Sequence, residues 1–185
     1  MARPALIVID MLNHFDFEGG AALARASEGI APRILRLRER FDRAGAPVIY
    51  ANDNWMHWRG EFQDLVAACR AAGGTPARLA DKLEPTRDHY YVLKPERSAL
   101  QFSALPVLLR QLSADQLVLA GVTTDACVLA TATDAYMRGY RLWIPSDCTS
   151  AETPKRKASA LRLARESLQA STRSTRLISN LFPTE

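Results

Sequence analysis

The chain has 185 residues, of which 48% are hydrophobic and 24% are charged. This composition excludes a disordered or fibrous protein, and the length predicts a single domain over residues 1–185. Basic residues number 24 and acidic residues 20, which gives a formal net charge of +4. The arginines alternate with acids, as in residues 38–43, and this is typical of a solvated helix face. We therefore expect no nucleic-acid partner.

The cysteine count and the hydropathy pattern indicate the cellular compartment of the protein. The 3 cysteines are too few for a disulfide framework and odd in number, so they favour a reducing cytoplasm. No apolar run approaches the roughly 20 residues that a membrane span needs. The apolar stretch near the N-terminus is too short for a signal peptide and lacks a cleavage site. We expect a cytoplasmic protein with no membrane partner.

Short apolar runs and longer amphipathic stretches alternate along the chain. The runs, which predict strands, are Leu6–Ile9, Val48–Ala51, Tyr90–Leu93, Leu117–Ala120 and Leu142–Ile144, with a weaker one at Thr175–Ile178. The stretches, which predict helices, are Pro32–Ala44, Glu61–Ala72, Pro76–Leu83, Leu105–Leu112, Asp125–Arg138 and Pro154–Gln169. In the first of these helices Pro32 suits the opening turn, and Gly45 ends the helix. The alternation predicts an α/β fold, a doubly wound (Rossmann-like) three-layer αβα sandwich with a parallel sheet of about six strands.

Two charged residues directly follow predicted strands. Ligands bind in doubly wound folds beyond the carboxyl ends of the strands, so these positions are candidates for chemistry. Asp10 follows the first run and Lys94 follows the third. A carboxylate there can act as a base, and an ammonium can stabilise a thiolate. A capping carboxylate and a solvated lysine explain the two residues about equally well.

The fourth predicted strand leads into a cysteine. Residues 117–128 pass from an apolar run through Gly121 and two threonines to Cys127, in the opening turn of a predicted helix. The unpaired N–H groups of a helix start lower a thiol pKa and can hold an oxyanion. A small buried cysteine is the alternative, as we expect for Cys69, and Cys148 follows a strand without a helix start. We therefore favour Cys127 as the nucleophile.

Five segments, in order, carry a resemblance to a known family. They are residues 6–11 (LIVIDM), 48–54 (VIYANDN), 94–99 (KPERSA), 121–128 (GVTTDACV) and 146–148 (SDC). With them the chain resembles the isochorismatase-like cysteine hydrolases, which include nicotinamidases, N-carbamoylsarcosine amidases and ureidoacrylate or biuret hydrolases. The resemblance implies a catalytic triad of Asp10, Lys94 and Cys127 and a cis peptide bond at Val122–Thr123, next to the oxyanion site. It also implies a homo-oligomer, either a dimer or a tetramer.

The chain departs from the family pattern at its histidines. His14 stands where relatives often carry an acid, in the motif Asp-Met-Gln-Asn-Asp-Phe. Nicotinamidases carry a metal site with an Asp-x-His element, whereas here His57 follows Asp53 by four residues and the next histidine is His89. We therefore expect no metal and disfavour a nicotinamidase. True isochorismatases lack the nucleophilic cysteine, so Cys127 favours cleavage of a C–N bond over vinyl-ether hydrolysis.

Aromatic and basic residues near the strand ends are candidates for binding a substrate. We expect the aromatic ones to wall a pocket and the arginines to hold a substrate carboxylate. Packing, a subunit contact or a solvated surface explains each of them nearly as well. The candidates are Phe15, Trp55, Trp58, Arg59, Arg97 and Phe102. Asp134 lies two helical turns beyond Cys127, too far for a direct part in catalysis.

These features together predict a cofactor-free cysteine hydrolase that cleaves a C–N bond of a small amide or ureido compound through a thioester. In this mechanism Asp10 takes the thiol proton of Cys127, and Lys94 stabilises the resulting charge. Three alternatives remain: a vinyl-ether hydrolase or lyase that does not use Cys127, a non-catalytic binding protein, and a Cys–His pair that uses His14 or His57.

Overall fold

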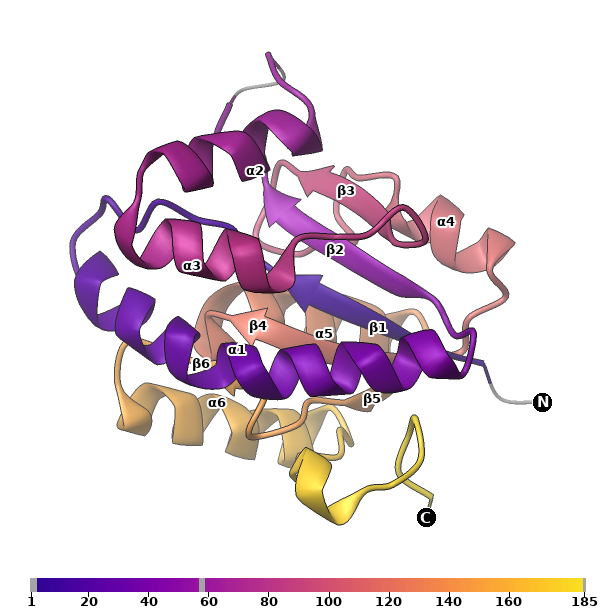
Figure 1. The fold of residues 1–185 in the computed structure, drawn as a ribbon. Helices are drawn as coiled ribbons and strands as arrows, with labels where there is room; N and C mark the ends of the chain where they lie inside the picture. The colour runs from indigo at the N-terminus through magenta and orange to yellow at the C-terminus, as the bar shows by residue number, and fades with distance from the viewer. Residues whose placement is uncertain (1–2, 57–58, 185) are drawn as a thin grey trace.

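The computed structural model describes residues 3–56 and 59–184. Its centre is a six-stranded parallel sheet in the order β3-β2-β1-β4-β5, with β6 paired to β4 (Figure 1). The strands are β1 (Pro4–Ile9), β2 (Val48–Asp53), β3 (Tyr90–Lys94), β4 (Gln116–Val122), β5 (Arg141–Trp143) and β6 (Thr149–Ser150). Because β1 pairs with both β2 and β4, the strand order reverses beside β1, as in doubly wound sheets.

Helices cover both faces of the sheet, which confirms the predicted three-layer sandwich (Figure 1). The first face carries α1 (Gly20–Arg43), α2 (Phe62–Ala71) and α3 (Gly74–Leu83). The second face carries α4 (Leu105–Gln111), α5 (Leu129–Met137) and α6 (Pro154–Ser167). Alternate strand residues supply the two cores: Leu6 and Val8 point to the first face, and Ala5 and Ile7 point to the second. Both sets are buried, so the strands read as continuous apolar runs.

Two of the predicted elements were wrong. The sixth strand is Thr149–Ser150, and Thr175–Leu177 forms a short 3₁₀ helix, η2, instead. Helix α1 begins at Gly20, well before Pro32, which lies inside it. Burial of an apolar stripe that includes Leu23 and Ile30 outweighs the backbone hydrogen bond lost at Pro32. Of the helices in the described part of the chain, none is both long and apolar enough to cross a membrane.

Gly121 of β4 lies opposite Ile9 of β1, where the two strands leave no room for a side chain. This glycine has a φ of +115°, and a Cβ atom built on it would lie 2.0 Å from the carbonyl oxygen of Ile9. Its backbone N–H also donates to the carbonyl oxygen of Cys148 at 2.8 Å. Only a residue without a side chain fits here, at the penultimate residue of β4.

Replacement of Gly121 by alanine should lower the free energy of unfolding by at least about 3 kcal/mol, because the new methyl group must push β4 away from β1. The matched control is Gly139→Ala, which also has a positive φ, +83°, but open space around the added carbon. That control should lose about 1 kcal/mol. Urea denaturation measures both, and equal losses would show that the contact with Ile9 is not what excludes a side chain.

Candidate active site

Three reactive side chains meet at the carboxyl edge of the sheet. Asp10 follows β1, Lys94 ends β3, and Cys127 lies in the π-helical turn η1 (Thr124–Val128) that follows β4. The ammonium nitrogen Nζ of Lys94 lies 2.9 Å from Oδ2 of Asp10 and 3.7 Å from Sγ of Cys127. Sequence reasoning predicted this meeting from the three strand ends, and the fold places the side chains within contact of one another.

The Asp10 carboxylate is held from two sides. Its Oδ1 accepts a hydrogen bond from the backbone N–H of Asp53 at 2.8 Å, and its Oδ2 faces Lys94. The residue adopts a left-handed conformation, with a φ of +52°, which aspartate tolerates better than most residues. Only 6% of Asp10 is exposed. Burial therefore raises the pKa of Asp10, although Lys94 and a hydrogen bond with Cys127 oppose the shift.

Lys94 is an unusually buried lysine, with 1% of its surface exposed. Besides Asp10 and Cys127, its ammonium contacts the carbonyl oxygen of Glu96 at 3.2 Å and the carboxylate of Asp53 at 3.9 Å. Burial lowers the pKa of Lys94, but the negative charge of Asp10 leads the opposing interactions, and these leave the pKa raised. The lysine is therefore charged, and it forms a buried ion pair with Asp10.

Cys127 is half-buried, and its thiol holds its proton. Burial and the nearby charge of Asp10 raise the pKa of Cys127 to about 12, although Lys94 lowers it. The expectation that the helix start lowers this pKa was therefore wrong. Burial and the charge of Asp10 outweigh the charge of Lys94, so the pKa of Cys127 moves upward. The resting site thus combines a neutral thiol, a carboxylate and an ammonium, and the carboxylate is placed to take the thiol proton.

The segment that leads to Cys127 is held in place by buried threonines. The peptide bond between Val122 and Thr123 is cis, at the position that the family resemblance implied. Thr149 donates to the carbonyl oxygen of Gly121 at 2.8 Å, and its hydroxyl lies 2.9 Å from that of Thr124. The carbonyl of Thr123 accepts from the N–H of Val128 at 3.1 Å, which closes the π-helical turn around the cysteine.

The three residues open into a cavity of about 350 Å³. Its lining combines the reactive groups with residues from the loops after β1 and β3. The members are Asp10, Asn13, Phe17, Leu23, Asp53, Lys94, Pro95, Glu96, Arg97, Val122, Thr123 and Cys127. A volume of this size suits a small molecule, and the walls offer both charged and apolar contacts.

Most of the residues that the sequence suggested for substrate binding lie elsewhere. Phe15 is buried in the first core, and Trp55 packs beside the same core with its ring centroid 4.6 Å from that of His14. Phe102 is 78% exposed and lines a different cavity with Phe62. Arg59 is exposed and outside the lining of this cavity, and Trp58 lies outside the described residues.

Of the five candidates within the described residues, only Arg97 lines the cavity, together with Phe17 and Leu23, which the sequence did not suggest. Phe17 follows the first predicted strand in the sequence, and this position could have indicated that it lines the cavity. Leu23 belongs to a helix whose start the sequence misplaced, so its position could not be anticipated.

The described residues form no group of three or more His, Cys, Asp or Glu side chains that could hold a metal ion. Asp53 is the aspartate that the sequence analysis compared with the Asp-x-His element of nicotinamidases. Its carboxylate faces the ammonium of Lys94. His14 lies against Trp55 and outside the cavity lining, and His57 is outside the described residues. Among the described residues, the reactive groups of this edge are the thiol of Cys127, the ammonium of Lys94 and the carboxylates of Asp10, Asp53 and Glu96.

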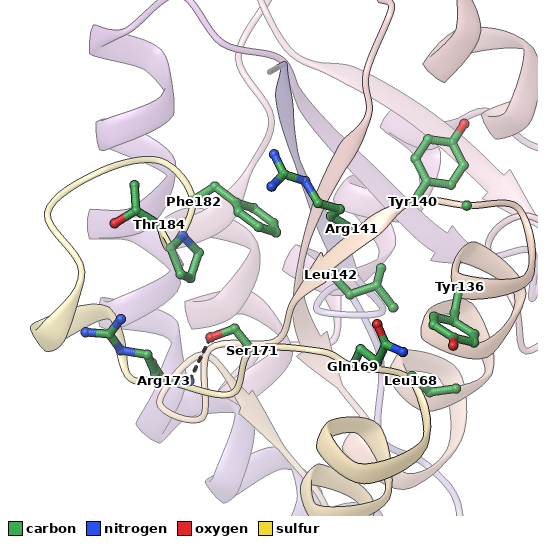
Figure 2. Close-up of a pocket in the computed structure, with 12 residues that line it drawn as sticks. Tyr136, Tyr140, Arg141, Leu142, Leu168, Gln169, Ser171, Arg173, Phe182 and Thr184 are labelled. Atoms are coloured by element: carbon green, nitrogen blue, oxygen red, sulfur yellow. Dashed lines mark hydrogen bonds between the residues drawn. The ribbon is translucent and has the colours of Figure 1, made fainter. Parts of the chain in front are cut away.

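A second cavity, of about 400 Å³, lies beside the start of β5 (Figure 2). Figure 2 shows Tyr136 and Leu142 on one side of it and Phe182 of the C-terminal tail on the other. The guanidinium of Arg141 lies 5.7 Å from the centre of the Phe182 ring. Among the described residues, this lining contributes no cysteine, histidine or carboxylate, so it lacks the pairing of a thiol with a carboxylate base that the first cavity has.

The fold and the first cavity define a class: a three-layer α/β protein with a buried Asp–Lys pair beside a cysteine at the sheet edge. The sequence model of the isochorismatase domain family matches residues 4–176 of the chain. The chain is 35% identical over 165 residues to YaaI of Bacillus subtilis (strain 168), an uncharacterized isochorismatase family protein, and the match covers 88% of each chain. The chain therefore belongs to the isochorismatase-like cysteine hydrolase family, which confirms the resemblance carried by the five sequence segments.

Solved structures of relatives share this fold. The nicotinamidase PncA from Bacillus subtilis superposes with a TM-score of 0.73 at 28% identity, and the match covers 93% of this chain and 100% of that one. The N-carbamoylsarcosine amidase from Thermoplasma acidophilum gives a TM-score of 0.72 at 25% identity, over 96% of this chain and 99% of that one.

Proposed function

We propose that this protein is a cysteine-dependent amidohydrolase that cleaves a C–N bond of a small amide or ureido compound. One observation carries the proposal: a thiol, a carboxylate and an ammonium converge in a small cavity, with Lys94 Nζ at 2.9 Å from Asp10 and 3.7 Å from Cys127. A nucleophile with an adjacent base and a fixed charge is what acyl transfer requires. The relatives named as amidases support the same reaction class.

In the first half-reaction Asp10 takes the proton of the Cys127 thiol as the sulfur attacks the substrate carbonyl. The new C–S bond forms while the carbonyl electrons move to oxygen, and backbone N–H groups at Cys127 and near Thr123 hold the oxyanion. Asp10 then gives the proton to the substrate nitrogen, the C–N bond breaks, and the amine leaves. Proton transfer from Cys127 to Asp10 leaves the net charge of the buried cluster unchanged, which keeps its cost low.

In the second half-reaction water hydrolyses the thioester. Asp10 takes a proton from the water as its oxygen attacks the thioester carbonyl, the C–S bond breaks to release the acid, and Asp10 returns the proton to the Cys127 sulfur. Lys94 keeps its charge throughout and stabilises whichever of Asp10 and Cys127 is negative. Burial raises the pKa of Asp10, which makes this carboxylate a stronger base than a solvated one.

The cavity walls indicate the kind of substrate. Arg97 is an exposed cation on the lining, and its guanidinium can hold a carboxylate of the substrate through two hydrogen bonds. Phe17 and Leu23 offer an apolar wall for a short carbon skeleton. Asp53 and Glu96 also line the cavity, and they disfavour a substrate with several negative charges. We therefore propose a small substrate with an amide or ureido group and one carboxylate.

Ammonia release from nicotinamide, N-carbamoylsarcosine and maleamate tests this assignment. We expect the two carboxylate-bearing compounds to be turned over with kcat/KM at least about tenfold above that for nicotinamide, because nicotinamide has no carboxylate for Arg97 to hold. Intact mass spectrometry during turnover should show an acyl adduct, and peptide mapping should place it on Cys127. Cys69 and Cys148 are buried, so they serve as internal controls.

Two results would contradict the proposal. One is ammonia release that continues at full rate after Cys127 has been alkylated and that proceeds without an acyl adduct on Cys127. The other is the absence of ammonia release across these compounds and a wider set of small amides and ureas.

A further inference from the structure

The Thr131 hydroxyl joins the turn that carries Cys127 to the loop that follows Lys94. Thr131 lies in the first turn of α5 and is fully buried. Its Oγ1 donates to the carbonyl oxygen of Cys127 at 2.7 Å and accepts from the backbone N–H of Ala99 at 3.0 Å. One side chain thus bridges two segments that are far apart in sequence and that supply two of the three reactive groups.

The loop after Lys94 is tied back to α5 at a second point. Ser98 donates to Asp134 at 3.0 Å, and its hydroxyl accepts from the N–H of Leu100 at 3.2 Å. Within the same loop, the carbonyl of Glu96 accepts from the ammonium of Lys94 at 3.2 Å. The position of the lysine head group therefore depends on how this loop is held against the helix.

We propose that Thr131 is a positioning residue, whose hydroxyl sets the separation of the Lys94 ammonium from the Cys127 sulfur. The proposal rests on the proposed function for the role of these two groups. Thr131 is fully buried, and its hydrogen bond with Ala99 is buried as well, so removal of the hydroxyl leaves the N–H of Ala99 without a partner. The attraction between an ammonium and a thiolate weakens with distance, and a site that is loosened by about 1 Å loses much of its rate.

The test compares Thr131→Val with Thr131→Ser. Valine keeps the shape of the side chain but removes both hydrogen bonds, whereas serine keeps the hydroxyl. The matched control is Thr133→Val on the same helix, since Thr133 makes the same kind of bond, to the carbonyl of Leu129 at 2.9 Å, but is exposed and does not reach the lysine loop. Circular dichroism and thermal unfolding show whether each variant is folded.

The first readout needs no substrate: the rate at which iodoacetamide alkylates Cys127, measured from neutral to alkaline pH. In Thr131→Val the lysine stabilises the thiolate less, so alkylation should slow at least about threefold at neutral pH and its pH profile should move to higher pH. The second readout is turnover of the best amide, for which we expect a fall in kcat of about 10- to 100-fold with little change in KM. Thr131→Ser should restore both readouts, and Thr133→Val should match the wild type.

The outcomes separate this inference from the proposed function. Alkylation of Thr131→Val at the wild-type rate and pH profile would overturn the positioning role, as would equal losses in the valine and serine variants. If Thr131→Val does not fold, Ser98→Ala becomes the decisive variant, and it must slow alkylation for the inference to stand. If the wild type hydrolyses no amide but the alkylation results hold, the proposed function fails while the positioning role survives.

Discussion

Replacement of Cys127 by alanine should abolish turnover, with kcat/KM for the best amide falling by at least about 10⁴-fold. The sulfur is the atom that the substrate acyl group joins, and a methyl group cannot take its place. Cys127 lies in a turn at the cavity wall, so its loss should leave the fold intact. The matched control is Cys69→Ala in α2, a buried cysteine outside the cavity lining, which should keep full activity. Ammonia release measures both variants, and a Cys127→Ala variant with undiminished activity would exclude the thioester route.

The same cysteine predicts how the substrate-free protein responds to pH. Because the pKa of Cys127 is raised to about 12, iodoacetamide should react with it slowly at neutral pH. The thiolate fraction grows about tenfold with each pH unit below the pKa, so alkylation should accelerate steadily towards alkaline pH. A rate that reaches a plateau near neutral pH would instead indicate a resting thiolate, and the first proton transfer to Asp10 would then have occurred before the substrate binds.

The second large effect concerns the buried pair of Asp10 and Lys94. Lys94→Met leaves the carboxylate buried without its cation, and Asp10→Asn leaves the ammonium buried without its anion. Each change should lower the free energy of unfolding by about 3–5 kcal/mol. Each should also lower kcat by at least about 10³-fold, because one variant loses the charge beside the thiol and the other loses the base.

The double variant separates stability from catalysis. Asp10→Asn combined with Lys94→Met buries no uncompensated charge, so it should recover most of the lost stability. The kcat of the double variant should stay as low as that of the less active single variant, since both the base and the ammonium are missing. Urea denaturation and ammonia release on the four proteins measure these effects. A double variant whose loss of unfolding free energy equals the sum of the two single losses would show that the two side chains do not act as a pair.

The position of the reactive groups could be predicted from the sequence because it follows from topology. Asp10, Lys94 and Cys127 each come after an apolar run, and parallel strands bring their carboxyl ends to one edge. The five strands with clear apolar runs were found nearly at their observed bounds. The sixth, Thr149–Ser150, has two residues and no apolar pattern, so its pairing with β4 is visible only in three dimensions.

What could not be predicted depends on distances across the fold. The pKa of Cys127 is set by its burial and by Asp10, a residue far away in sequence, and not by the local turn alone. The cavity wall includes Leu23 because α1 extends back to Gly20, whereas Pro32 suggested a later start. Thr131 could not be predicted, since its hydrogen bond with Ala99 joins helix α5 to the loop after β3, and the sequence pattern does not show that these two segments meet.

The pairing of β1 with β4 divides the sheet into an amino-terminal half, β1–β3, and a carboxyl-terminal half, β4–β6. Asp10 and Lys94 belong to the first half and Cys127 to the second, so the reactive cluster spans the seam between them. Neither half contains both a nucleophile and its base. The cluster of the three side chains is therefore complete only where β1 pairs with β4, with Ile9 opposite Gly121 at the end of the seam.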